Sequence, residues 1–407
     1  MSAYRSKRAH FLESVVLSVL GIGIYNCILQ FVLYPAFSRA LGTEAFGDVL
    51  TLLSVQSIFA IAVGAGVSLA RMANVPRFQA VNGDYNRILL PGFAVVTAVG
   101  VGTLLYYGSG SRLSFVLYPV LGVVTALRYY CAVAFRLEIN YRKNFLFYLL
   151  LSVGYLAGLA VFRVCVHWEL ALLCGEAVAV AYTALRSPVL RPPFLQKSEH
   201  FPAVTRSCAA LVSAQLFLYL TMHTDRLLIG AVTDGTQVTI YYTASLLGKA
   251  MAMLTEPIAG VAIGFLARTK TFGRKQFLLA SAGSVLLGAL AFLVMLPVSP
   301  WLIGLLYPDV VSDASPYFLI ANGGQIVYFI ANLLLVVALR FMAEKYQTIL
   351  NACYGIAFFS LCTPALHLGG LPLFCKAVLL LNLLRLAATL LLGVYHAEKG
   401  CDKHGIG

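Results

Sequence analysis

Charged side chains are scarce in this sequence of 407 residues, and their scarcity excludes an ordinary soluble protein. Asp, Glu, Lys and Arg together make up 11% of the chain, whereas soluble domains carry about 25%. Hydrophobic residues make up 60%, so a water-soluble fold could not cover its surface with polar groups. We conclude that the chain is an integral membrane protein.

Several motifs that mark enzymes are also missing. The sequence contains no Walker A loop for ATP, no HExxH zinc motif and no Ser-His-Asp arrangement that the spacing supports. Its nine cysteines include no CxxC pair, and eight of them lie in or beside apolar runs, which is typical of small apolar fillers. The sequence therefore predicts a protein that is not an enzyme, with no catalytic residue, no cofactor and no metal site.

Twelve apolar runs alternate with short polar loops, and each is close to the 20 or so residues that a helix needs to cross the hydrocarbon core. Within a few residues at each end, the runs cover 14–36, 48–70, 88–107, 114–135, 145–166, 169–186, 207–231, 238–264, 277–299, 316–339, 348–368 and 371–394. The sequence therefore predicts an all-α polytopic membrane protein with twelve transmembrane helices.

Lys and Arg in the connecting segments predict how the chain is oriented. The two tails and every second loop hold 21 of them, whereas the alternate loops hold only Arg39, Arg112 and Arg163. Cytoplasmic loops are the basic ones in membrane proteins, so we expect both termini in the cytoplasm. The same distribution explains the formal net charge of +13 without nucleic acid as a partner.

A proline-rich loop divides the predicted helices into two groups of six. We expect an N-terminal six-helix bundle over 1–190, a cytoplasmic linker over 191–206, a C-terminal six-helix bundle over 207–396 and a cytoplasmic tail over 397–407. The triplet Gly42-Thr43-Glu44 before the second run is echoed by Gly235-Thr236-Gln237 before the eighth, 193 residues later. Such an echo suggests two related halves.

Eight charged side chains lie more than three residues from either end of an apolar run, where a charge costs about 2.5 to 3.5 kcal/mol and usually faces a cavity or a partner. They are Arg128, Arg226, Lys249, Lys376, Arg385, Glu176, Asp225 and Glu256. Lys376 lies near the outer end of its run, where we expect it at the interface. Five of the eight are basic, so the predicted membrane interior carries net positive charge.

Four of these residues form two pairs in the sequence. Asp225 and Arg226 are adjacent and therefore roughly 100° apart on a helix, so they do not face one another. They either find partners elsewhere, on another helix or in water, or reach together to the outer interface. Lys249 and Glu256 lie two turns apart on one helix face, which marks that face as polar. That face borders either a cavity or another helix that supplies an ion pair.

The remaining charges leave more than one interpretation open. Arg128 either lies deep or extends to the cytoplasmic side, and Arg385 lies in the inner half of the last run. Glu176 has no obvious partner in sequence and is either a proton-titrating group or a buried, protonated carboxyl.

Three amides also lie inside the apolar runs. Asn26 and Gln30 share one face of the first run, and Gln56 lies in the second. Side-chain amides at such positions more often join helices than bind a substrate.

Four motifs resemble those of one membrane-protein family. The pattern R-x-L-G-x-x-x-F-G covers 39–47, D-R-x-x-I-G covers 225–230, Y-x-A-S covers 242–245, and F-R-x-x-x-x-Y covers 135–141. Their order and their places on the span map are similar to those of Wzx-type polysaccharide flippases, which are members of the MOP superfamily of exporters.

The resemblance implies two six-helix bundles around a central cavity, in a bacterial inner membrane. It also implies that an oligosaccharide linked to undecaprenyl pyrophosphate moves from the cytoplasmic to the outer leaflet by alternating access, for O-antigen, capsule or exopolysaccharide synthesis. Partners would be this substrate, membrane lipid, and the polysaccharide polymerase and chain-length proteins.

The same resemblance gives the intramembrane polar residues their expected roles. The groups expected to line the cavity and bind the pyrophosphate and sugars are Arg128, Arg226, Lys249, Arg385, Asn26, Gln30 and Gln56. The carboxylates expected to couple transport to an ion gradient are Asp225, Glu256 and Glu176.

Two other classes of membrane protein fit the sequence less well. A multidrug exporter of the same superfamily mostly carries organic cations, so its cavity should be net acidic, whereas the predicted spans here are net basic. A membrane-bound polysaccharide polymerase commonly carries a large exterior loop with Arg and His, whereas the exterior loops here are short and nearly free of basic residues.

Overall fold

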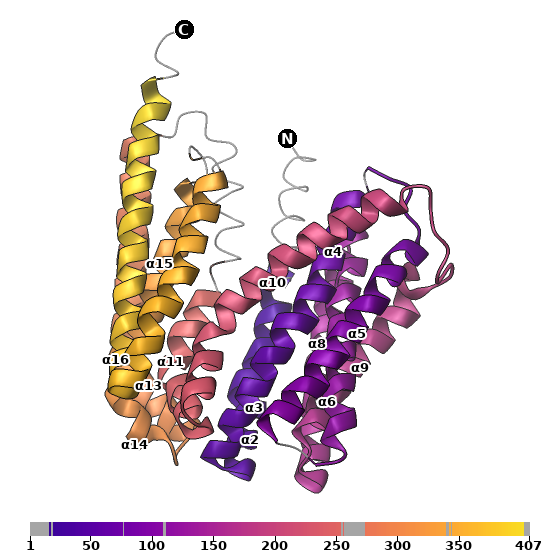
Figure 1. Cartoon of the computed structure of the whole chain (residues 1–407), viewed down its shortest axis with the longest axis horizontal. Coiled ribbons are helices and arrows are strands. Elements are labelled where there is room, and N and C mark those ends of the chain that lie inside the picture. The colour runs from indigo at the N-terminus through magenta and orange to yellow at the C-terminus, as the bar shows by residue number, and fades with distance from the viewer. Residues whose placement is uncertain are drawn as a thin grey trace, which may run out of the picture. The chain divides into compact units, whose positions relative to one another are not determined.

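In a computed structural model of the chain, the fold consists of helices joined by short loops (Figure 1). The structure describes residues 16–402 except 18, 76, 109–110, 254, 256–272, 339–341 and 343, and these described residues contain no strand. The principal helices, in chain order, are α2 (Tyr34–Leu41), α3 (Thr43–Gln56), α4 (Ala62–Asn74), α5 (Asn82–Tyr107), α6 (Ser114–Cys131), α7 (Val133–Leu137), α8 (Tyr141–Cys165), α9 (Trp168–Arg186), α10 (Phe201–Val232), α11 (Gly235–Met253), α13 (Arg274–Leu306), α14 (Val311–Ala314), α15 (Phe318–Ala338) and α16 (Glu344–Asp402).

Ten helical stretches among the described residues are long and apolar enough to cross a membrane, against the twelve predicted. One difference arises at the predicted run 238–264, which begins in α11. That helix is not one of the ten, and the second half of the predicted run lies outside the described residues. The other difference arises because one stretch, Tyr346–Ala397, covers both of the last two predicted runs.

The last of these stretches reverses direction at a glycine. A straight helix would place Tyr354 and Asn382 about 42 Å apart at 1.5 Å per residue. Instead, the Tyr354 hydroxyl donates a 2.9 Å hydrogen bond to Asn382 Oδ1. Gly370 lies between them with φ 59° and ψ −155°, a backbone conformation that glycine adopts at little cost and that ends a helix. Helix α16 therefore consists of two antiparallel segments, one before Gly370 and one after it.

The chain separates into two compact units. Unit 1 comprises Met1–Gly42 and Asp48–Leu227, and unit 2 comprises Thr43–Gly47 and Leu228–Gly407. In unit 1, α6 packs against α5 and α9, and α9 packs against α8. In unit 2, α15 packs against α11, α13 and α16 (Figure 1). The predicted division of the chain at the linker 191–206 stays a prediction.

The linker between the predicted halves is held by side chains from the start of α5, within unit 1. Asn82 donates to the carbonyls of Pro188 and Arg191, each at 2.8 Å. The further bonds run from Asn86 to the Phe194 carbonyl, from Arg87 to the Leu195 carbonyl, and from the Ser198 amide to Asp84. These polar groups fix the path of residues 191–200, which contain no helix, before α10 begins at Phe201.

The short segment Thr43–Gly47 belongs to unit 2, although it begins a helix that continues in unit 1. The Thr239 hydroxyl donates a 2.7 Å hydrogen bond to the Thr43 carbonyl. A Cβ at Gly47 would overlap the backbone of Gly235, so only glycine permits this approach. Within unit 2, the segment Thr43–Gly47 therefore lies against the beginning of α11, where the second of the two sequence motifs is found.

Candidate functional site

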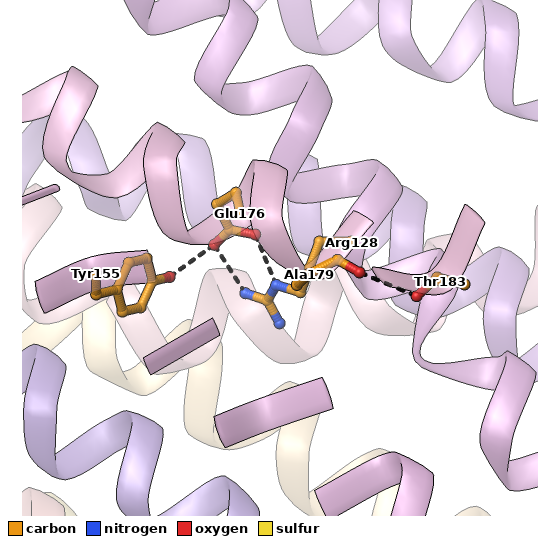
Figure 2. A network of polar contacts seen from close by, with 5 residues as sticks. All are labelled: Arg128, Tyr155, Glu176, Ala179 and Thr183. Atoms are coloured by element: carbon orange, nitrogen blue, oxygen red, sulfur yellow. Dashed lines mark hydrogen bonds and ion pairs between the residues drawn. The ribbon is translucent and has the colours of Figure 1, made fainter. Parts of the chain in front are cut away.

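The centre of unit 1 holds a buried ion pair between Arg128 of α6 and Glu176 of α9. Arg128 Nε lies 2.7 Å from Glu176 Oε2, and Nη2 lies 3.1 Å from Oε1. The Tyr155 hydroxyl of α8 donates a third bond, 2.8 Å long, to Oε1 (Figure 2). The two charged side chains are 3% and 4% exposed. Each carboxylate oxygen is thus bonded, as a buried charge requires.

Aromatic rings flank the same guanidinium. The Arg128 carbon Cζ lies 3.7 Å from the centroid of the Tyr129 ring and 5.7 Å from that of Tyr25. Ring faces carry partial negative charge and attract a cation. Arg128 is therefore neutralised by one carboxylate and shielded by two rings. The sequence indicated no partner for Glu176, and the structure supplies one from 48 residues away.

Unit 2 holds a second buried arginine, Arg385, with different partners. Its Nη2 donates to Asn332 Oδ1 of α15 at 2.7 Å and to Asn351 Oδ1, before Gly370, at 2.9 Å. Its Cζ lies 4.8 Å from the ring centroid of Tyr328 and 4.6 Å from that of Tyr354. The residue is 6% exposed.

The charge of Arg385 has no carboxylate partner among the residues that the structure describes. Salt bridges in that part of the chain involve other residues. Within the same part of the chain, Arg385 Nε and Nη1 are buried and have no hydrogen-bond partner. Two neutral amide oxygens therefore solvate one nitrogen, while the positive charge itself stays uncompensated by these residues.

The two clusters use equivalent helices of the two predicted halves. The fourth, fifth and sixth predicted runs supply Arg128, Tyr155 and Glu176, and the tenth, eleventh and twelfth supply the cluster in unit 2. In unit 1 a tyrosine of the fifth run donates to Glu176 of the sixth. In unit 2 a tyrosine of the eleventh run, Tyr354, donates to Asn382 of the twelfth. The clusters differ at the arginine: Glu176 also accepts from Arg128 of the fourth run, whereas Asn382 donates to the Gly324 carbonyl and Arg385 lies on the twelfth run beside it.

The other charged candidates lie on α10 and α11. Asp225 is buried and Arg226 half-buried, and the Asp225 Oδ1 accepts the backbone N–H of Arg226 at 2.8 Å. Lys249 is half-buried, with its Nζ 5.3 Å from the centroid of the Tyr241 ring. Glu256 lies outside the described residues. Lys376, on α16, is exposed, and its expected place at the membrane interface stays a prediction.

The three amides predicted from the sequence lie in unit 1. Asn26 donates to the carbonyl of Ile22 on its own helix at 2.9 Å. Gln30 is buried within a π-helical turn, Leu29–Leu33, and Gln56 is buried just before a second one, Ser57–Ile61. Such turns occur often at functional sites. In the described chain Gln56 Oε1 has no hydrogen-bond partner.

Sequence reasoning missed the polar residues that surround Arg385. Each of the last three predicted runs contains an asparagine that takes part in the cluster: Asn332, Asn351 and Asn382. The same reasoning that selected Asn26 and Gln56, an amide inside an apolar run, would have selected these three. No signal in the sequence indicates that they converge on one arginine.

A metal centre has no basis in the described residues, which contain no group of three or more His, Cys, Asp or Glu side chains placed to hold an ion.

Comparison of the sequence with protein-family models and with curated proteins gives no match.

Solved structures of similar fold do exist. One is the inward-facing form of a multidrug resistance MATE family transporter of the MOP superfamily, at 13% identity and a TM-score of 0.63, over 95% of this chain and 99% of that one. The outward-facing form of such a transporter gives 13% identity and a TM-score of 0.58, over 95% and 96%. The Vibrio cholerae MATE transporter VcmN in its bent form gives 16% and 0.60, over 98% and 99%.

This chain has the fold of MATE transporters. The likeness extends over almost the whole length of both chains, so the MATE-type fold accounts for unit 1 and unit 2 alike. At these identities the comparison concerns the fold and leaves the substrate open.

Proposed function

We propose that the chain is a membrane transporter that works by alternating access. The observation that supports this most directly is the MATE-type fold over at least 95% of the chain, similar to both inward-facing and outward-facing transporters. A fold that is known in both states suits a protein that exposes one site to each side of a membrane in turn.

The proposed topology has twelve spans in a bacterial inner membrane, in two six-helix bundles around a central cavity, with both termini in the cytoplasm. Two observations support it. The reversal at Gly370 makes two membrane-length segments of α16, and 21 of 29 Lys and Arg residues lie on the side predicted to be cytoplasmic.

The proposed substrate is an oligosaccharide linked to undecaprenyl pyrophosphate, carried to the outer leaflet for surface polysaccharide synthesis. The Wzx-like motifs support this choice, and so does the charge inside the predicted spans, five basic against three acidic side chains. One of those three acids, Glu176, is bonded to Arg128. The net positive charge left over suits a pyrophosphate, which guanidinium groups bind well.

For ion coupling, we propose Asp225 or Glu256 ahead of Glu176. A proton that binds Glu176 would leave the Arg128 guanidinium buried without its counter-charge, which is costly. Asp225 is buried and next to the half-buried Arg226.

The second candidate function is export of drugs or other small molecules. It is favoured by the neighbours of similar fold, of which the inward-facing one is described as a multidrug resistance transporter. The net basic spans favour an anionic substrate instead, because a binding site for organic cations should be net acidic.

Complementation in bacteria tests the proposal and separates it from the second candidate. The chain is expressed in a strain without its polysaccharide flippase and, separately, in a drug-sensitive strain without its main exporters. We expect surface polysaccharide to return in the first strain and drug resistance to stay low in the second. Resistance without polysaccharide would establish the exporter instead.

A further inference from the structure

We infer that unit 2 binds a small anion at Arg385, in the role that the Glu176 carboxylate has in unit 1. The inference concerns unit 2 alone and does not require the substrate proposed above.

Arg385 has more N–H donors than the described residues around it supply acceptors for. A guanidinium has five N–H donors. Asn332 and Asn351 accept from Nη2, at 2.7 Å and 2.9 Å. The donors on Nε and Nη1 are buried and have no partner among the described residues. Buried donors without partners are rare in proteins, so each one calls for an acceptor.

Charge is the second argument. Arginine stays protonated in proteins, so Arg385 cannot become neutral by losing a proton, as a buried lysine can. Its acceptors within the described chain are amide oxygens, which solvate a cation but do not cancel its charge. No described residue supplies the missing negative charge, and we assign it to a bound group.

Unit 1 shows what completes such a cluster. There the Glu176 carboxylate contacts Arg128 at Nε and Nη2, and a tyrosine hydroxyl donates to the carboxylate. In unit 2 the equivalent tyrosine, Tyr354, donates to Asn382, a neutral residue. Among the described residues, the acceptors of Arg128 thus include a carboxylate, whereas those of Arg385 are the amide oxygens of Asn332 and Asn351 alone.

The rings of the cluster determine where an anion would bind. The ring centroids of Tyr328 and Tyr354 lie 4.8 Å and 4.6 Å from the Arg385 Cζ, so a ligand would approach the guanidinium from a side that these rings do not cover. Asn351 is exposed and Asn332 half-buried, so the cluster reaches the surface of unit 2 at this point. A halide ion or one oxygen of a phosphate group has the required charge and acceptor capacity.

The test measures thermal unfolding of the purified full-length protein in detergent. The starting buffer contains gluconate, a bulky organic anion, and is titrated with sodium chloride or with inorganic pyrophosphate while ionic strength is held constant. A ligand that binds only the folded state raises the melting temperature with its concentration. We expect such a rise for the wild-type protein with at least one of the two anions.

Two isosteric variants supply the missing charge from within the chain. Asn332→Asp and Asn351→Asp each convert an oxygen that already accepts from Arg385 into a carboxylate oxygen. We expect either variant that folds to lose the anion dependence and to melt, in gluconate alone, at or above the temperature of the anion-saturated wild type. Arg385→Met should lose the anion dependence as well.

The converse variant is Glu176→Gln, which removes the carboxylate that neutralises Arg128 in unit 1. We expect its melting temperature to show a second rise with anion concentration. Glu256→Gln tests whether an acid outside the described residues neutralises Arg385. We expect its melting temperature to depend on anion concentration as that of the wild type does.

Three results would overturn the inference. The first is a wild-type melting temperature that neither anion changes. The second is the same rise in the wild type, Asn332→Asp and Arg385→Met, which would be a general salt effect. The third is an anion dependence that appears only in Glu256→Gln, because Glu256 would then be the partner of Arg385. A rise with both anions indicates a site for free inorganic anions, and a rise with pyrophosphate alone indicates a site for a phosphate group.

Discussion

Arg128 and Glu176, 48 residues apart in sequence, meet at two points in the centre of unit 1, at 2.7 Å and 3.1 Å. The pair is nearly inaccessible to solvent and is completed by the Tyr155 hydroxyl. The ion pair thus joins α6 to α9, and the Tyr155 hydrogen bond joins α8 to α9. The stability of unit 1 should therefore depend on keeping both partners or on removing both.

The first prediction concerns that dependence. Glu176→Gln leaves Arg128 buried with its charge uncompensated, and breaking a buried pair in this way costs about 3 to 5 kcal/mol. In a gluconate buffer we expect a clear fall in melting temperature and in the yield of folded protein. Tyr155→Phe removes one bond to a charged group and should cost about 1.5 to 3 kcal/mol.

The double variant Arg128→Met/Glu176→Leu is the control for this prediction. Apolar side chains of similar volume can replace a buried pair at little cost, so the double variant should recover most of the stability that Glu176→Gln loses. A double variant that is as unstable as the sum of the single changes would mean that the charges have a role beyond their mutual neutralisation.

The sequence predicts the helices well and their contacts poorly, for a physical reason. Apolar runs of about 20 residues predict membrane helices, because backbone N–H and C=O groups in lipid must hydrogen-bond to one another within the segment. The pairing of Arg128 with Glu176 depends on how closely α6, α8 and α9 pack. Glycines such as Gly154 and Gly175 set that distance, since a Cβ at Gly154 would press on the backbone at Gly175. No local pattern encodes such an approach.

The reversal at Gly370 illustrates the intermediate case. The predicted runs 348–368 and 371–394 are separated in the sequence by two residues, Gly369 and Gly370. The positive φ of Gly370 and the bond between Tyr354 and Asn382 give the reversal its physical basis. The amides around Arg385 were visible as residues but not as a cluster, because three separate helices bring them together.

The second prediction concerns the first motif of the sequence. Gly47→Ala places a methyl group on the backbone of Gly235, and such overpacking costs typically about 1 to 3 kcal/mol. Gly355→Ala is the matched control, because its Cβ would meet nothing within 4 Å and alanine favours a helix by about 1 kcal/mol over glycine. Melting temperatures of the two variants should move in opposite directions. Equal effects would contradict the close approach of α3 and α11.

The third prediction concerns the linker. Asn82→Ala removes two hydrogen bonds to the linker backbone, at the Pro188 and Arg191 carbonyls. At about 1 kcal/mol each, their loss should raise the opening of the linker roughly 30-fold. Limited trypsin digestion measures this opening, since Lys197, followed by Ser198, is a cleavage site within the linker. Asn140→Ala, which changes an asparagine that caps α8, should leave the rate unchanged. Equal rates in both variants would mean that the Asn82 bonds do not hold the linker.

The fourth prediction compares two intramembrane lysines. Lys249 is half-buried beside Tyr241, whereas Lys376 is exposed. If Lys249 contributes a charge-assisted contact to a phosphate, Lys249→Ala should lower transport roughly 10- to 100-fold, in line with about 1.5 to 3 kcal/mol for such bonds. Lys376→Ala should retain transport. Surface polysaccharide in the complemented strain, normalised to protein in the membrane, is the readout, and full activity of Lys249→Ala would remove this residue from the proposed site.

Movement of the substrate across a bilayer by the purified chain tests the central claim most directly. Proteoliposomes are loaded with an undecaprenyl-pyrophosphate oligosaccharide in both leaflets, and a membrane-impermeant lectin or glycosidase reports how fast the inner pool reaches the outside. We predict that the chain exposes the inner pool faster than protein-free liposomes do, and that Lys249→Ala is slower than Lys376→Ala. A rate equal to that of protein-free liposomes, in vesicles that do transport a cationic dye, would contradict the account.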